Sequence, residues 1–163
     1  LDVLQFTRGR DGQFLPPSQW RPHAVATTTT HDLPTTAGWL AGNDIAWRER
    51  LHLAAPREVR RQRQERAADA SRLETALRAQ GWRGAVGPSG AADYIGASAC
   101  ALALLPAEDA LALQEQPNLP GTVDVHPNWR RRLPPGAPTA EVDAVLQTLA
   151  QARTRTPIPM ESP

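Results

Sequence analysis

The sequence predicts an α/β fold built on three parallel strands, and three observations support this prediction. Short runs rich in β-branched or apolar residues occur at residues 2–6, 25–30 and 99–105. Helical patterns separate the second run from the third. Polar residues follow both of these runs, as they do at the C-terminal ends of strands in parallel folds. The order strand, strand, helices, strand, helix is that of about the last three βα units of a (β/α)8 TIM barrel, with helical insertions.

Chain length limits how much of a barrel is present. The 163 residues and their 40% hydrophobic content suffice for one ordinary domain, whereas a complete barrel takes about 250 residues. The chain begins at Leu1 without an initiator Met, and it shows neither a signal peptide nor an apolar run of membrane-spanning length. We therefore expect that an N-terminal part is missing.

Charge and cysteine content argue against several kinds of partner and site. The formal net charge is only +1, which gives no overall field to attract nucleic acid or an anionic membrane. Cys100 is the single cysteine, so neither an intrachain disulfide nor a Cys-based metal site is possible. A reducing cytoplasm is the compartment we expect.

Local signals define the remaining elements. Trp20, in a Pro-rich loop, is expected to pack in the interior. Pro56 suits the first turn of a helix and Gly81 ends the pattern that follows it, while Thr139 can N-cap the last helix. The apolar run at residues 99–105 is expected to be the most buried strand. The predicted helices cover residues 35–41, 43–53, 57–80, 91–98 and 107–113, and a last helix follows Thr139.

The helix predicted over residues 57–80 is rich in arginine. Glu58, Glu65 and Asp69 are interleaved with these arginines, which predicts a solvated, ion-paired face. A nucleic-acid patch is the alternative, but the interleaved carboxylates and the absence of Lys disfavour it.

Two pairs of ionisable residues follow predicted strands. His31 and Asp32 come directly after residues 25–30, and Pro34 then turns the chain away. The pair is either a site at the end of a strand or a solvated edge with a turn cap. Glu108 and Asp109 follow residues 99–105. They too could belong to a site at the end of a strand, but we favour a structural role for them as N-terminal charges of the next short helix.

Two longer motifs carry a family resemblance. TTTTHDLPTTAGW at residues 27–39 and NLPGTVDVHPNWRRRLP at residues 118–134 occur in this order, and VLQF at residues 3–6 precedes them. Together they resemble the C-terminal part of the 4-α-glucanotransferases, also called amylomaltases or disproportionating enzymes. The resemblance implies that residues 1–152 are the C-terminal portion of a catalytic barrel, and we expect residues 153–163 to be a disordered tail.

The resemblance also implies a reaction. Members of the family transfer α-1,4-glucan segments between maltodextrins by a retaining double displacement, which needs a carboxylate nucleophile and a carboxylic acid/base. Asp32 matches the family's transition-state stabiliser, and His31 matches a histidine that binds the same sugar. Asn118 lies where the family lines the substrate groove, although Pro-Gly after it also makes a tight turn. No cofactor and no metal ion are implied.

Other positions of the second motif are less informative. The Trp129–Arg130 pair lies where the family lines its groove, yet we expect Trp129 and His126 to be structural. Val125 replaces an acidic residue that many relatives carry, so a hydrogen bond there would be lost.

The nucleophile and the acid/base match no residue of this chain. We therefore expect them in the missing N-terminal part of the same enzyme, and we expect the isolated chain to be inactive. The alternative is a non-catalytic glucan-binding or assembly module. A maltodextrin is the expected ligand in either case.

Overall fold

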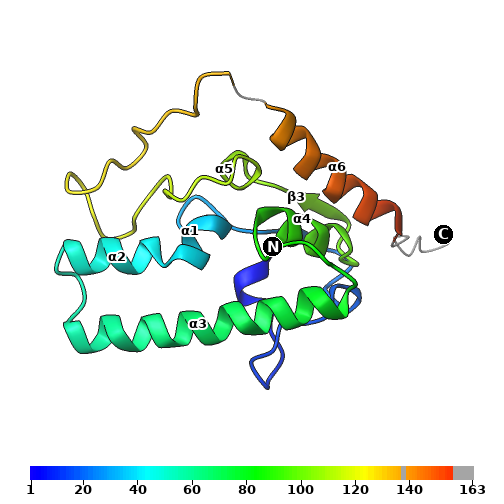
Figure 1. Cartoon of the computed structure of the whole chain (residues 1–163), viewed down its shortest axis with the longest axis horizontal. Coiled ribbons are helices and arrows are strands. Elements are labelled where there is room, and N and C mark those ends of the chain that lie inside the picture. Colours follow the sequence, from blue (N-terminus) through cyan, green and yellow to red (C-terminus); the bar gives the residue numbers. More distant parts are fainter. Residues whose placement is uncertain (137–138, 156–163) are drawn as a thin grey trace.

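The computed structural model describes residues 1–136 and 139–155 of the chain. Three strands form one sheet in the order β1 (Asp2–Val3), β2 (Val25–Thr27) and β3 (Leu102–Leu104). Both pairings are parallel, and Ala26 of β2 lies between Asp2 and Ala103. The α/β class and the parallel sheet are therefore confirmed (Figure 1).

The first strand is shorter than the sequence predicted. After Val3 the chain forms a 3-10 turn, Leu4–Phe6, which the bond from the Thr7 N–H to the Leu4 carbonyl closes at 3.3 Å. Leaving the sheet at this point lets Leu4 enter the core, where it is 2% exposed. A run of apolar residues fits a strand and such a turn equally well.

The prediction that residues 99–105 form the most buried strand is wrong. Leu102 and Leu104 of β3 are 58% and 55% exposed, whereas Ala26 in the central strand β2 is fully buried. β3 pairs with one strand only among the described residues, so it forms an edge. A purely apolar run has the same pattern whether neighbouring elements cover both its faces or only one.

Helices occupy the expected parts of the chain. Thr35 caps α1, since its hydroxyl accepts the Gly38 N–H at 3.0 Å, and Pro56 is the first residue of α3. Four helices lie between β2 and β3, where the sequence predicted helices. The helices are α1 (Thr36–Ala41), α2 (Asn43–Arg50), α3 (Pro56–Ala79), α4 (Pro88–Gly96), α5 (Ala107–Ala110) and α6 (Ala140–Arg155), with a 3-10 turn at Pro17–Gln19.

Ion pairs cover the arginine-rich helix α3, as predicted. Arg61 contacts Glu58 at 2.7 Å and Glu65 at 2.8 Å. Arg66 contacts Asp44 of α2 at 2.8 Å, and this pair is only slightly exposed. It joins α3 to α2, which lies beside it (Figure 1).

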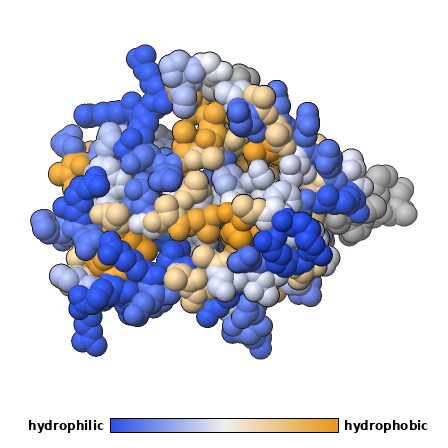
Figure 2. All heavy atoms as spheres, in the orientation of Figure 1, coloured by the Kyte–Doolittle hydropathy of each residue, from blue (hydrophilic) through white to orange (hydrophobic). Residues whose placement is uncertain are grey.

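Aromatic residues form much of the core between the sheet and the helices. Trp20 is 2% exposed, which confirms its predicted packing role. Its indole N–H and the Tyr94 hydroxyl both donate to the Leu15 carbonyl, at 3.0 and 2.9 Å. On the surface, Figure 2 shows hydrophobic residues near the centre of the face, surrounded by hydrophilic ones.

The last helix packs on α4. A side chain at Gly96 would meet Ala152 and the Leu149 carbonyl, each at 2.7 Å, so the two helices approach closely. Thr139 accepts the Val142 N–H at 3.4 Å, which confirms the predicted cap. α6 continues to Arg155, so the first residues of the expected tail are helical; residues 156–163 of that tail lie outside the described residues. None of the helices described is long and apolar enough to cross a bilayer.

Candidate functional site

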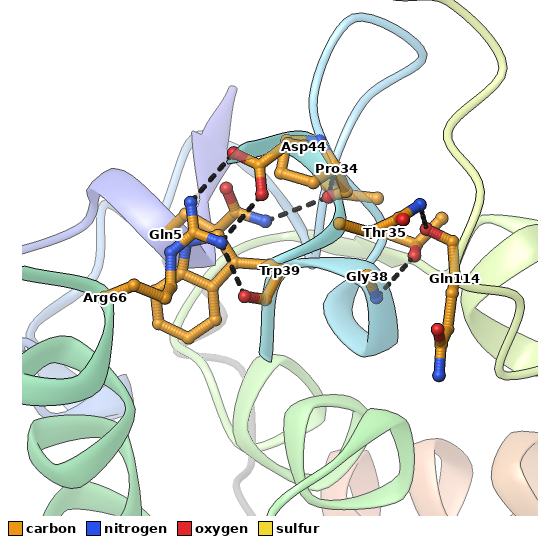
Figure 3. Close-up of polar contacts among 10 residues, drawn as sticks. Gln5, Pro34, Thr35, Gly38, Trp39, Asp44, Arg66 and Gln114 are labelled. Carbon is orange, nitrogen blue, oxygen red and sulfur yellow. Dashed lines mark hydrogen bonds and ion pairs between the residues drawn. The ribbon is translucent and has the colours of Figure 1, made fainter. Parts of the chain in front are cut away.

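The His31–Asp32 pair lies in the tight connection between β2 and α1. The Leu33 N–H donates to the Thr30 carbonyl at 3.1 Å and closes a turn around the pair. The next carbonyl, that of Pro34, accepts the Gln5 side chain at 3.0 Å (Figure 3) and the Thr29 hydroxyl at 2.8 Å. The turn is therefore attached to the segment after β1 as well as to β2.

Three residues that the sequence singled out come together here. The Asn118 side-chain amide donates to Asp32 Oδ1 at 2.7 Å, and His31 Nε2 lies 3.2 Å from Asp32 Oδ2. The Asn118 backbone N–H also donates to the His31 carbonyl at 3.2 Å. The side chains of His31 and Asp32 are 59% and 49% exposed, so a ligand in solution can reach both.

A network of hydrogen bonds shapes the loop that follows Asn118. Asn128 Oδ1 accepts the Leu119 N–H at 2.9 Å and lies 2.7 Å from His126 Nδ1. The Asn128 amide donates to the Thr122 carbonyl at 3.0 Å. His126 is 1% exposed and lies edge-on against Trp47 with ring centroids 4.7 Å apart. Its burial agrees with the structural role expected for it.

Trp129 differs from the expectation that it is structural. It is 65% exposed, and its ring lies 5.3 Å from the His31 ring. Its backbone has a positive φ of 59°, and its N–H donates to the Pro117 carbonyl at 3.0 Å. The loop therefore presents an aromatic ring beside His31 and leaves it outside the core, at a backbone conformation that a bulky residue rarely adopts.

An open cavity of about 670 Å³ lies at the C-terminal ends of β2 and β3, within the usual size range of ligand pockets. Trp47 and Arg131 both bind the carboxylate of Glu115 in its wall, at 2.8 and 3.0 Å. Asp32 and Asn118 adjoin His31 and do not line the cavity. The lining residues include Thr29, Thr30, His31, Glu108, Glu115, Trp129, Arg131 and Arg132.

The Arg and Val positions of the second motif can now be placed. Arg131 and Arg132, and not Arg130, line the cavity. Arg130 lies 3.8 Å from Asp124 in a highly exposed pair. Val125 is 62% exposed.

Among the described residues, no cluster of three or more His, Cys, Asp or Glu side chains is suited to hold a metal ion.

Asp109 does not act mainly as an N-terminal charge of its own short helix α5, which was the role predicted for it. The side chain is fully buried, and its carboxylate accepts the Thr36 N–H at 2.6 Å and the Thr36 hydroxyl at 2.8 Å. The Thr28 hydroxyl also donates to it. Asp109 thus binds the first residue of α1 and not the end of its own short helix. Burial raises the pKa of this carboxyl, and the bonds from Thr28 and Thr36 oppose the shift.

Comparisons with known proteins agree with the motifs. The family model for 4-α-glucanotransferase matches residues 1–138. A 4-α-glucanotransferase of Mycobacterium bovis and two of Mycobacterium tuberculosis strains are each 35% identical to the chain, over 97% of it and 24% of their own length.

A solved structure is similar as well. The crystal structure of amylomaltase from Corynebacterium glutamicum superposes with a TM-score of 0.68 and 26% identity, over 93% of this chain and 25% of that one. The chain therefore spans about a quarter of the length of the relatives it matches. A match over most of the chain to both the family model and the mycobacterial sequences shows that this chain belongs to the 4-α-glucanotransferase family.

Proposed function

We propose that this chain forms the sugar-holding part of a 4-α-glucanotransferase, which moves α-1,4-glucan segments between maltodextrins by a retaining double displacement. The observation that carries the proposal is the contact of Asp32 with both His31 and Asn118, beside an open cavity. Family membership supports the reaction class.

Asp32 has the properties of a transition-state stabiliser. Its carboxylate is half-exposed, and neighbours on both sides fix its two oxygens. Such a carboxylate accepts hydrogen bonds from the hydroxyls of the reacting sugar, and these bonds strengthen as the ring acquires oxocarbenium character. His31 contacts the same sugar. An interaction that is stronger at the transition state than in the ground state raises kcat.

Asn118 and Trp129 support binding at either side of this pair. Asn118 holds Asp32 Oδ1 through its amide and so limits the rotation of the carboxylate. The exposed ring of Trp129 beside His31 offers a flat apolar surface, and aromatic residues of this kind commonly line ligand sites.

The nucleophile and the acid/base are proposed to come from sequence outside these 163 residues. A retaining displacement needs two carboxyl groups on opposite sides of the scissile bond. Glu115 is held by Trp47 and Arg131, which leaves it poorly placed to attack a sugar. Asp109 is fully buried.

We propose further that the sheet is part of a (β/α)8 barrel. Both β1 and β3 are edge strands among the described residues. Large apolar side chains on or next to them are exposed, including Leu1, Phe6, Leu102 and Leu104. Neighbouring strands and helices of a barrel would cover such side chains.

Transfer from maltotriose tests the proposal. The isolated chain should release no glucose and form no longer dextrins, whereas the same chain joined to the proposed upstream segment should do both. Transfer by the isolated chain would contradict the assignment of the nucleophile and acid/base. Binding of maltodextrin by the longer protein without any transfer would instead support the alternative, a non-catalytic glucan-binding module. The exposed carboxylate of Asp32 could bind a sugar in such a module as well.

A further inference from the structure

We propose that Asp109 is a positioning residue for Asp32, because its buried carboxylate joins the two ends of the segment that carries the His31–Asp32 pair. Asp109 does not itself contact the sugar in this account. The inference rests on the proposed function, since it concerns how the same site is held in place.

The geometry of the carboxylate carries this inference. One of its partners is Thr28, directly after β2, and the other is Thr36, the first residue of α1. Thr36 donates through both its backbone N–H and its hydroxyl. Residues 29–35 lie between the two partners and include His31 and Asp32. One side chain therefore fixes where this connection begins and where it ends.

The ends of the connection are buried and its middle is exposed. Thr28 and Thr36 are 0% and 4% exposed, whereas the side chains of His31 and Asp32 are about half-exposed. Two contacts hold the Asp32 carboxylate directly, those with His31 and Asn118. Its position also depends on where the two buried ends of the connection are held.

The segment that provides Asp109 also leads to Asn118. Between them, the Leu113 carbonyl accepts the Thr35 hydroxyl, and the Gln114 carbonyl accepts the Asn43 amide at 3.0 Å. Figure 3 shows Gln114 beside Thr35 and Gly38 of the α1 turn. Residues 109–118 therefore contact the β2–α1 connection at both its ends, through Asp109 and Leu113, and at Asp32, through Asn118. A shift at Asp109 would thus change the placement of Asp32 relative to Asn118.

Burying the Asp109 carboxyl costs free energy that an apolar residue used only for packing would not cost. All three donors to Asp109 are neutral, namely two hydroxyls and one backbone N–H. A buried carboxyl with neutral partners loses more hydration than an apolar side chain of similar size. The same carboxyl accepts three hydrogen bonds at once, from residues on both sides of the His31–Asp32 turn. An apolar side chain could not hold the turn in this way.

Nuclear magnetic resonance on this chain gives the first test, and it does not depend on activity. Asp109→Asn and Thr28→Val should both move the side-chain amide resonances of Asn118, which report its bond to Asp32. Thr28→Ser keeps the hydroxyl and should restore the wild-type positions. Asp93→Asn is the matched control, because Asp93 is a buried carboxylate of α4 that pairs with Arg155 of α6. It should leave the Asn118 resonances in place.

Kinetics of the longer enzyme give the second test. Asp109→Asn and Thr28→Val should lower kcat about ten- to a hundredfold per folded molecule, with a smaller change in KM, because small misplacements of a catalytic group cost rates of this order. Thr28→Ser and Asp93→Asn should keep the wild-type kcat.

The two proposals fail in different ways. A longer wild-type protein without transfer would refute the proposed function, and the resonance test would then decide the positioning role alone. Folded Asp109→Asn and Thr28→Val variants with unchanged Asn118 resonances, or with wild-type kcat in an active enzyme, would overturn the positioning role.

Discussion

The side-chain amide of Asn118 donates to Asp32 Oδ1 at 2.7 Å, although 86 residues separate the two in the sequence. His31 lies against the other carboxylate oxygen at 3.2 Å. The carboxylate is therefore held from both sides while it stays open to solvent. A charged acceptor kept in one orientation in advance loses little freedom when a sugar binds.

Removing the Asn118 amide should weaken this arrangement. We expect Asn118→Ala to lower kcat/KM of the active enzyme by roughly fivefold, since an exposed hydrogen bond to a charged group contributes about 1 kcal/mol. Asn118→Asp should cost more, because it places a second carboxylate against Asp32. Steady-state kinetics on maltotriose measure both. Wild-type constants for both variants would show that the contact has no role in catalysis.

Gly38 should be sensitive to the smallest substitution. A Cβ at this position would lie 2.1 Å from the Gln114 carbonyl oxygen, so α1 would have to move away from the segment that leads to Asn118. We expect Gly38→Ala to lower the free energy of unfolding by about 1–3 kcal/mol. Gly87→Ala is the control, because a Cβ there meets nothing within 4 Å. Equal melting temperatures for the two variants would contradict the close approach.

Local signals predicted much of the fold. Pro56 at the start of α3, Thr139 as a cap, and the β-branched residues of β2 act through their own backbone or nearest neighbours. These signals need no knowledge of distant residues. The resemblance likewise identified the Asp32, His31 and Asn118 positions that the structure brings together.

Features that depend on distant partners were missed. The pairing of Asp109 with Thr28 spans 81 residues, and no local pattern distinguishes it from a charge at the start of α5. The exposure of Leu102 and Leu104 depends on which elements cover β3. Trp129 lies beside His31 at the end of the loop that its N–H closes by a bond to the Pro117 carbonyl, a geometry that composition alone does not reveal.

The buried carboxyl of Asp109 should make stability depend on pH. Burial raises its folded-state pKa above the ordinary value of 3.8, so folding favours the protonated form. Its contribution to stability is complete below that ordinary value and is lost as pH rises through the folded pKa. Relative to Asp109→Asn, the wild type should therefore lose stability as the pH rises above about 4. Urea unfolding of both proteins across this range measures the difference, and parallel pH profiles would contradict the raised pKa.

Trp129 should affect binding more than folding. We expect Trp129→Ala to weaken maltoheptaose binding by roughly fivefold, an aromatic contact contributing about 1 kcal/mol, with little change in melting temperature because the ring is 65% exposed. Val125→Ala is the control, since Val125 is similarly exposed in the same loop and does not line the cavity. Calorimetric titration measures the affinities. A large loss of stability without a loss of affinity would restore the structural role for Trp129.

The turnover of Asp32→Asn, measured per folded molecule in the active enzyme, tests the central claim most directly. If Asp32 holds the sugar hydroxyls most tightly at the transition state, kcat should fall on the order of a hundred- to a thousandfold, or about 3–4 kcal/mol, while ground-state binding changes less. His31→Ala should show a smaller loss of rate. If Asp32 only caps a turn, Asp32→Asn should cost about 1 kcal/mol of stability and leave turnover nearly intact, and that result would contradict a catalytic role for Asp32.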